Sequence, residues 1–171
     1  MAPLIVLLAT FLIAVFAIKI IHKKYDIALA GRIAMSAMLL FTSLGHFMYT
    51  HGMTMMLPEF IPFKTQLVYF TGVLEILAAI GLQITRIRVL TAWLLILFFL
   101  LLLPANINAA IKHVDFQKGT FEGEGANYLW FRIPLQVLFI VWTYLSSIKH
   151  THRSKVAGNN ARIKQPLAGH L

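Results

Sequence analysis

The residue with the clearest chemical potential is Glu75, a carboxylic acid in the middle of the apolar stretch 71–81 (TGVLEILAAIG). A chargeable side chain at the centre of a membrane helix costs roughly 2.5–3.5 kcal/mol on insertion scales. Such a residue usually faces protein rather than lipid, and it needs a partner. Thr71 lies one helical turn earlier on the same face and can donate a hydrogen bond to Glu75.

Other polar side chains fall in apolar segments at a depth similar to that of Glu75. A helix rises about 1.5 Å per residue, which places Glu75 about 15 Å and His46 about 6 Å below the same end of the bundle. Counting residues places them all between the midplane and the outer surface, whereas their facing one another is a hypothesis based on the cost of leaving them in lipid. Imidazole and carboxylate could then exchange protons, and guanidinium and amide groups could bind a carbonyl or an anion. The predicted ligand-binding set is His46, Thr71, Glu75, Asn106, Arg132 and Gln136.

Each of these residues also has a structural interpretation. Glu75 can be a buried group that stabilises the bundle, and His46 can be an ordinary interhelical hydrogen-bonding residue. Asn106 can cap the break that Pro104 makes in its helix. Arg132 lies near a helix end and can extend its head to the interface. Taken singly, each residue favours the structural interpretation, and only the depth-matched set favours a pocket, so no catalytic residue is assigned.

The composition indicates a membrane protein with one domain. The chain has 171 residues, of which 59% are hydrophobic and 12% charged, with a mean hydropathy of +0.78. A soluble domain carries about twice that share of charge. The net charge of +9 does not indicate nucleic-acid binding, because the basic residues lie at the ends of hydrophobic blocks. The absence of cysteine excludes disulfides, thiol redox cycling and iron–sulfur centres, and we expect no metal site.

Five apolar stretches are close to the ~20 residues that a bilayer requires: 4–21, 31–50, 66–83, 89–109 and 128–148. Backbone polar groups must be paired in lipid, so each stretch is predicted to be a helix. The predicted fold is an all-α polytopic membrane protein with a four-helix transmembrane core and one added N-terminal helix. The segments are an N-terminal transmembrane helix (1–24), the four-helix domain (25–148) and a basic cytoplasmic tail (149–171) that we expect to be disordered.

The distribution of Lys and Arg predicts that the N-terminus is outside and the C-terminus inside, because cytoplasmic loops carry the excess of these residues. The loop 51–65 is apolar and contains two prolines, which predicts a segment that lies at the interface or dips into the bundle. His51, Met53, Met55 and Met56 are soft Cu(I) donors, although packing by adaptable methionines is favoured.

Several short motifs, taken in order, carry a resemblance to a known family. They are Arg32, GHF (45–47), LP (57–58), IP (61–62), TGVLE (71–75), PANI (104–107), RIPLQ (132–136) and Trp142. Over residues 31–147 the chain resembles the DoxX/DoxX-like family of small bacterial membrane proteins. The resemblance implies a four-helix core in the bacterial inner membrane and an association with membrane redox processes. Relatives that form disulfides use cysteines, which this chain lacks, so that activity does not carry over.

We therefore expect an accessory or binding subunit of a membrane redox process, with an outward-facing pocket for a quinone or another apolar molecule with a polar head. The alternative is an assembly or chaperone-type interaction protein without catalysis, which a distant animal branch of the family resembles. A third reading is an isomerase or oxidase acting on a lipid-like substrate. The expected partners are the lipid bilayer, a membrane or periplasmic protein and a second copy of the chain, but no nucleic acid.

Overall fold

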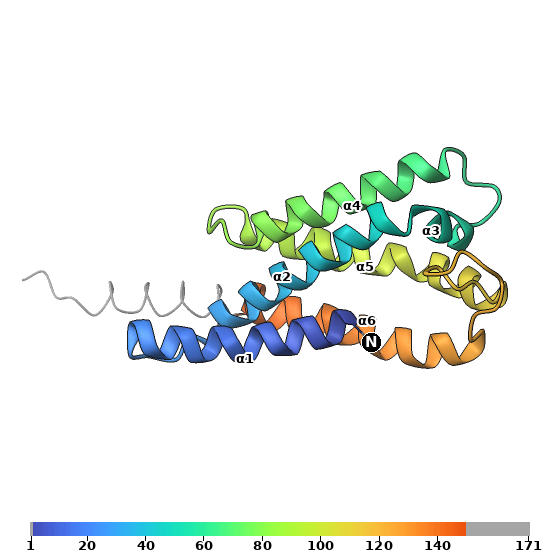
Figure 1. Ribbon diagram of the computed structural model, residues 1–171. Helices are drawn as coiled ribbons and strands as arrows, with labels where there is room; N and C mark the ends of the chain where they lie inside the picture. Colours follow the sequence, from blue (N-terminus) through green and yellow to red (C-terminus); the bar gives the residue numbers. More distant parts are fainter. Residues whose placement is uncertain (1, 150–171) are drawn as a thin grey trace, which may run out of the picture.

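The computed structural model describes residues 2–149, which form helices and no strand. The elements are α1 (Ala2–His22), α2 (Ile27–Met48), α3 (Thr50–Met56), α4 (Lys64–Gly81), α5 (Arg88–Ile111), α6 (Ala126–Thr143) and a π-helical turn, η1 (Tyr144–Lys149). The long helices lie side by side and share one general direction (Figure 1). The predicted all-α class is confirmed. The tail predicted for residues 149–171 lies outside the described residues, apart from Lys149 at the end of η1.

Four of the described helices are long and apolar enough to cross a membrane. They are α1, α2, α5 and the continuous helix that α6 and η1 make over Ala126–Lys149. These helices indicate a membrane protein. The exposed surface of α1 supports this, since Ile5, Leu12 and Phe16 are 63%, 68% and 67% exposed. The 18-residue helix α4 is not among the four, and it carries both Lys64 and Glu75.

The helix boundaries follow from local sequence signals. Asp26 caps α2, because its Oδ1 accepts a hydrogen bond of 2.8 Å from the backbone N–H of Leu29. Pro58 and Pro62 lie between α3 and α4, where neither helix can continue. Pro104 lies inside α5, which continues past it to Ile111.

An apolar core joins the long helices. It contains fully buried residues from α1 and α2, such as Leu7 and Leu39, together with Ala79 of α4, Leu95 of α5 and Phe139 of α6. In a bilayer these contacts stabilise the bundle by van der Waals packing, because lipid chains are as apolar as the side chains themselves. The helices pack most closely as α1 with α2, α2 with α4 and α5 with α6, and the last two pairs each hold polar residues of their own.

The segment 51–65 does not extend away from the bundle. It contains most of α3, which folds back over the end of the bundle that also carries the loop between α5 and α6 (Figure 1). The side-chain amide of Asn108 donates a hydrogen bond of 2.8 Å to the carbonyl of Met56, which ties α3 to the end of α5. The backbone of Gly52 lies directly against the carbonyl of Phe116.

Candidate functional site

His46 and Glu75 meet in the interior between α2 and α4. The Nε2 atom of His46 lies 3.7 Å from Oε1 of Glu75, and the two residues are only 9% and 5% exposed. Each of the two side chains lies on the face of its helix that is directed toward the partner helix. The structure therefore gives the buried carboxyl group a partner from another helix, which the cost of burial required.

The other ring nitrogen of His46 is held by α4. Its Nδ1 atom lies 3.0 Å from the carbonyl oxygen of Val68 and 3.1 Å from Oγ1 of Thr71. The Thr71 hydroxyl also donates a hydrogen bond of 2.8 Å to the Val68 carbonyl. A carbonyl oxygen can only accept, so this geometry favours the tautomer in which Nδ1 carries a hydrogen and donates it to Val68.

That tautomer has a consequence for Glu75. With the hydrogen on Nδ1, a neutral His46 presents a lone pair at Nε2 toward Oε1 of Glu75, and two acceptors repel each other. A proton between the two groups removes the repulsion, either as imidazolium with carboxylate or as imidazole with carboxylic acid. The pair therefore places an imidazole and a carboxyl group, the side chains that proton exchange uses, within 3.7 Å of each other.

The second carboxyl oxygen of Glu75 is the unusual atom of the site. Oε2 is fully buried and has no hydrogen-bond partner among the described residues. A buried polar atom without a partner costs about 1–3 kcal/mol. Thr71, which we expected to donate to Glu75, instead binds Val68 and His46. The hydrogen-bonding capacity of Oε2 is thus unused within the described chain.

A glycine lets the two helices approach closely enough for this contact. A Cβ atom on Gly72 would lie 2.9 Å from Cβ of His46 and 3.4 Å from the ring of Phe47. Next to this contact the rings of Phe47 and Tyr69 stack with centroids 5.7 Å apart. The small residue therefore places the His46 ring against α4.

A second polar cluster lies between α5 and α6. The Tyr128 hydroxyl donates a bond of 3.2 Å to Oδ1 of Asn106, whose Nδ2 donates one of 3.4 Å to Oε1 of Gln136. Nε2 of Gln136 donates a short hydrogen bond to the carbonyl of Phe99. Pro104 has no N–H to donate to the carbonyl of Leu100, and the carbonyl that receives this bond belongs to the residue before Leu100. In this chain of bonds each side-chain acceptor is used, which is the pattern of a structural link between two helices.

Arg132 belongs only loosely to the second cluster. Its guanidinium carbon lies 6.0 Å from the centre of the Tyr128 ring, and the residue is half-buried. It makes no ion pair with Glu75 among the described residues.

The six predicted residues thus fall into two groups. His46, Thr71 and Glu75 are joined to one another, and Asn106 and Gln136 are joined to Tyr128, but no hydrogen bond or ion pair within residues 2–149 links the two groups. The carbonyl of Val68 is a functional contact that sequence reasoning missed, since every residue has a carbonyl and only its geometry distinguishes this one. The sequence did contain a signal for Tyr128, because this residue lies four residues before Arg132 and eight residues before Gln136.

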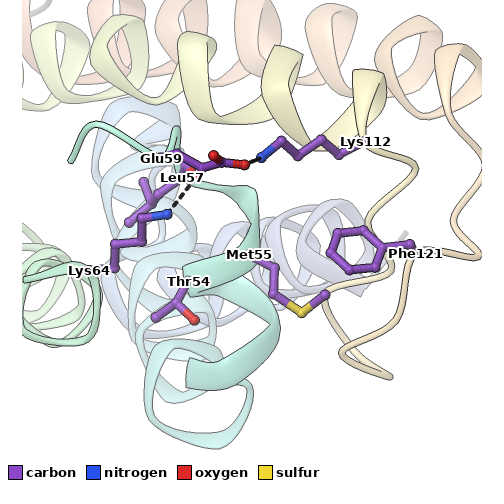
Figure 2. A pocket seen from close by; sticks show the side chains of 7 residues that line it. All are labelled: Thr54, Met55, Leu57, Glu59, Lys64, Lys112 and Phe121. Carbon is purple, nitrogen blue, oxygen red and sulfur yellow. Dashed lines mark hydrogen bonds and ion pairs between the residues drawn. The ribbon is translucent and has the colours of Figure 1, made fainter. Parts of the chain in front are cut away.

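A hollow of about 280 Å³ lies outside both groups, at the end of the bundle that carries α3. Figure 2 shows its lining, in which Lys112 pairs with Glu59 at 2.7 Å and Lys64 reaches the carbonyl of Leu57 at 3.4 Å. Met55 and Phe121 supply an apolar side to it. None of the six predicted residues lines this hollow. No group of three or more potential metal-ligating residues (His, Cys, Asp or Glu) occurs in the described part of the chain.

Comparison with known proteins identifies one family. A family model described as "Domain of unknown function (DUF8561)" matches residues 35–147, about two thirds of the chain. The matched range contains all six predicted site residues and leaves out α1 and Arg32. No curated protein and no solved structure matches the chain. The chain belongs to the family defined by this domain of unknown function, DUF8561.

Proposed function

We propose that this protein is a non-catalytic binding or accessory subunit of a membrane redox process, and that Glu75 and His46 bind the polar head of an apolar molecule, with a quinone or quinol as the first candidate. The observation that carries the proposal is the buried Oε2 of Glu75, which has no partner within the chain. A quinol hydroxyl would donate to this oxygen. A quinone carbonyl would accept from it when the carboxyl is protonated.

The proposed ligand matches the surroundings of the site. The flanking residues Phe47, Tyr69 and Val73 are 45%, 42% and 44% exposed, so apolar surface adjoins the polar contact on the outside of the α2–α4 pair. A molecule that is soluble in the bilayer could reach this surface from the lipid. The proton held between His46 and Glu75 would let the site bind either redox form without leaving a buried charge unpaired.

The number and orientation of the membrane spans and the relationship to the DoxX-like family are part of the same proposal. Five spans in a bacterial inner membrane, with the N-terminus outside, would place His46 and Glu75 in the outer half of the bilayer. The proposal counts α4 as the fifth span, since it lies along α2 over most of its length (Figure 1). The DoxX-like resemblance supports a redox association and remains part of the proposal.

The direct test is quinone and quinol binding to the purified full-length protein in detergent, measured by quenching of intrinsic tryptophan fluorescence. A hydrogen bond to a charged group contributes about 1.5–3 kcal/mol, so Glu75→Gln should weaken quinol binding about 10- to 100-fold. Glu59→Gln is the matched control, because it removes an exposed carboxylate far from the pair. It should bind within about twofold of wild type.

Two results would show the proposal to be wrong. One is that the wild-type protein binds neither redox form. The other is that Glu75→Gln, shown to be folded by its circular dichroism and melting curve, binds the quinol as tightly as Glu59→Gln does.

A second candidate function is an assembly or chaperone-type interaction protein. The observation that favours it is a group of strongly exposed aromatic residues at or near the α3 end: Phe60, Phe63, Phe121 and Trp130 are 84%, 76%, 60% and 82% exposed. Aromatic residues are enriched at protein interfaces and at membrane interfaces alike. Crosslinking in native membranes separates the two, since recovery of monomer alone from photocrosslinkers at Phe60 and Trp130 would exclude a stable partner there.

A further inference from the structure

Arg32 is a buried cation at the opposite end of α2 from His46. It is 5% exposed, and the separation of fourteen positions in the sequence corresponds to about 21 Å along the helix. Its NH1 group donates a hydrogen bond of 3.1 Å to the carbonyl of Ser146 in η1. Its Nε atom is buried and has no partner among the described residues. One hydrogen bond to a neutral carbonyl does not compensate a buried guanidinium.

The chain supplies no carboxylate in contact with this guanidinium. Arg32 forms no ion pair within residues 2–149. Asp26 is the one acidic residue at this end of the described bundle, and its Oδ1 is already engaged in capping α2. The charged groups that act on Arg32 are Asp26, which attracts it, and Arg88, which repels it. Arg88 is itself held by the end of α4, since its Nε donates 3.1 Å to the Leu82 carbonyl.

Further donors lie beside Arg32. The hydroxyl oxygens of Ser146 and Ser147 are 3.4 Å apart, and both serines are buried in the π-helical turn. Single π-helical turns are frequent at functional sites, because they widen the helix and redirect its polar groups. Lys149 ends the same turn, Lys19 lies in the last turn of α1, and Lys23 and Lys24 lie in the connection from α1 to α2. The surroundings are thus rich in donors and positive charge and poor in acceptors.

We propose that Arg32, with Arg88 and the Ser146 hydroxyl, binds a phosphate group at this end of the bundle. A phosphate offers the acceptor oxygens and the negative charge that the buried guanidinium lacks. The headgroup of an anionic phospholipid and free inorganic phosphate share this chemistry. The lipid headgroup is the favoured source, because the site lies at the end of the helices whose outer surfaces are apolar. This site is separate from the pair at Glu75 and does not depend on the function proposed for it.

The test is native mass spectrometry of the full-length protein in detergent, titrated with phosphatidylglycerol. Diacylglycerol of the same chain length is the control lipid, since it lacks only the phosphoglycerol head, and inorganic phosphate is the competing ion. We expect phosphatidylglycerol to bind at least about tenfold more tightly than diacylglycerol. Arg32→Gln should remove most of this difference. Arg86→Gln removes an equal charge from an exposed position at the same end and should change the affinity less than about twofold.

A second variant keeps the proposal testable if Arg32→Gln fails to fold. Asp26→Asn retains the helix cap, because Asn caps as well as Asp, and it removes the nearby negative charge. It should tighten binding about two- to fivefold. Binding of inorganic phosphate that depends on Arg32, without a preference for the lipid, would support the site and assign its source to free phosphate. Any one of three results would overturn the proposal. The first is equal binding of both lipids without phosphate competition, and the second is equal effects of Arg32→Gln and Arg86→Gln. The third is an unchanged affinity in Asp26→Asn.

Discussion

The close approach of α2 and α4 at Gly72 can be tested by adding a single methyl group. In Gly72→Ala the new Cβ would lie 2.9 Å from Cβ of His46, closer than carbon atoms pack in proteins. The new Cβ would also lie 3.4 Å from the Phe47 ring, so a small rotation of the helix cannot relieve the contact with His46. The helices must separate, or the imidazole must move away from Glu75.

The expected size of the effect comes from a comparison with Gly45→Ala in the same helix pair. A Cβ on Gly45 would meet only Met53 at 3.6 Å and Tyr49 at 4.0 Å, which are ordinary contacts. Both substitutions gain helix propensity of about 1 kcal/mol, so this contribution cancels in the difference. Overpacking a filled interior costs about 1–3 kcal/mol. Gly72→Ala should therefore be about 1–3 kcal/mol less stable than Gly45→Ala.

The free energies of unfolding can be measured by equilibrium titration of the detergent-solubilised protein with SDS, followed by circular dichroism. The chemical shifts of the His46 ring provide a second readout, because displacement of the ring changes its contact with Val68 and Glu75. If the two alanine variants have equal stability and unchanged His46 shifts, the close packing of α2 on α4 at this point is wrong.

Two further predictions concern residues outside the α2–α4 pair. Gln136→Leu leaves the carbonyl of Phe99 and the amide of Asn106 without their partner, so it should lower the free energy of unfolding by about 1–3 kcal/mol and leave quinol affinity unchanged. The hydrogen bond from Lys112, its charge and that of Lys64 lower the pKa of Glu59, so Lys112→Gln should raise that pKa in a carboxyl NMR titration. The folded-state pKa of Glu59 is depressed, so this pair stabilises the fold at pH values above the unfolded-state pKa. That stabilisation is lost as the pH falls through the folded-state pKa. In Lys112→Gln the stability should therefore fall less over this pH range.

The helices themselves could be predicted from the sequence, because their signals are local. Hydrophobic length and the positions of prolines predicted helices at 66–83 and 89–109, and the structure has Lys64–Gly81 and Arg88–Ile111. The short helix α3 was not predicted, since only a membrane-surface or re-entrant segment was expected there. Its position depends on the contacts of Asn108 and Gly52 with distant residues, which no local pattern records.

The candidate site could be predicted only in part. Counting residues along each helix gave the depth of Glu75 and His46, which do meet, but depth does not determine which helices are neighbours. Asn106 and Gln136 lie in a separate helix pair and bind each other. The rotation of each helix about its own axis decides such pairings, and that rotation is set by packing at positions such as Gly72. The hydrophobic pattern of a helix defines this rotation only coarsely. It therefore cannot distinguish one pocket of six residues from two separate clusters.

The buried polar groups of the membrane helices differ in how completely the chain satisfies them. The hydroxyls of Thr42, Ser43 and Thr143 donate to carbonyls of their own helices, so they need no further partner. Glu75 and Arg32, at opposite ends of the α2 interface, each retain a buried atom without one.

Within the helices that the structure describes, the two groups left with an unpartnered buried atom are therefore a carboxyl and a guanidinium, while a third such atom, Oγ1 of Thr120, lies in the loop between α5 and α6. Carboxyl and guanidinium groups are those whose burial costs the most. A ligand that binds only the native state stabilises it by RT ln(1 + [L]/Kd), about 2.7 kcal/mol at 100 times Kd. Because Arg32 and His46, the partner of Glu75, lie about 21 Å apart along α2, stabilisation by a quinol and by a phosphate should add. A bundle that depends on both ligands would reach its full stability only in a membrane that contains them.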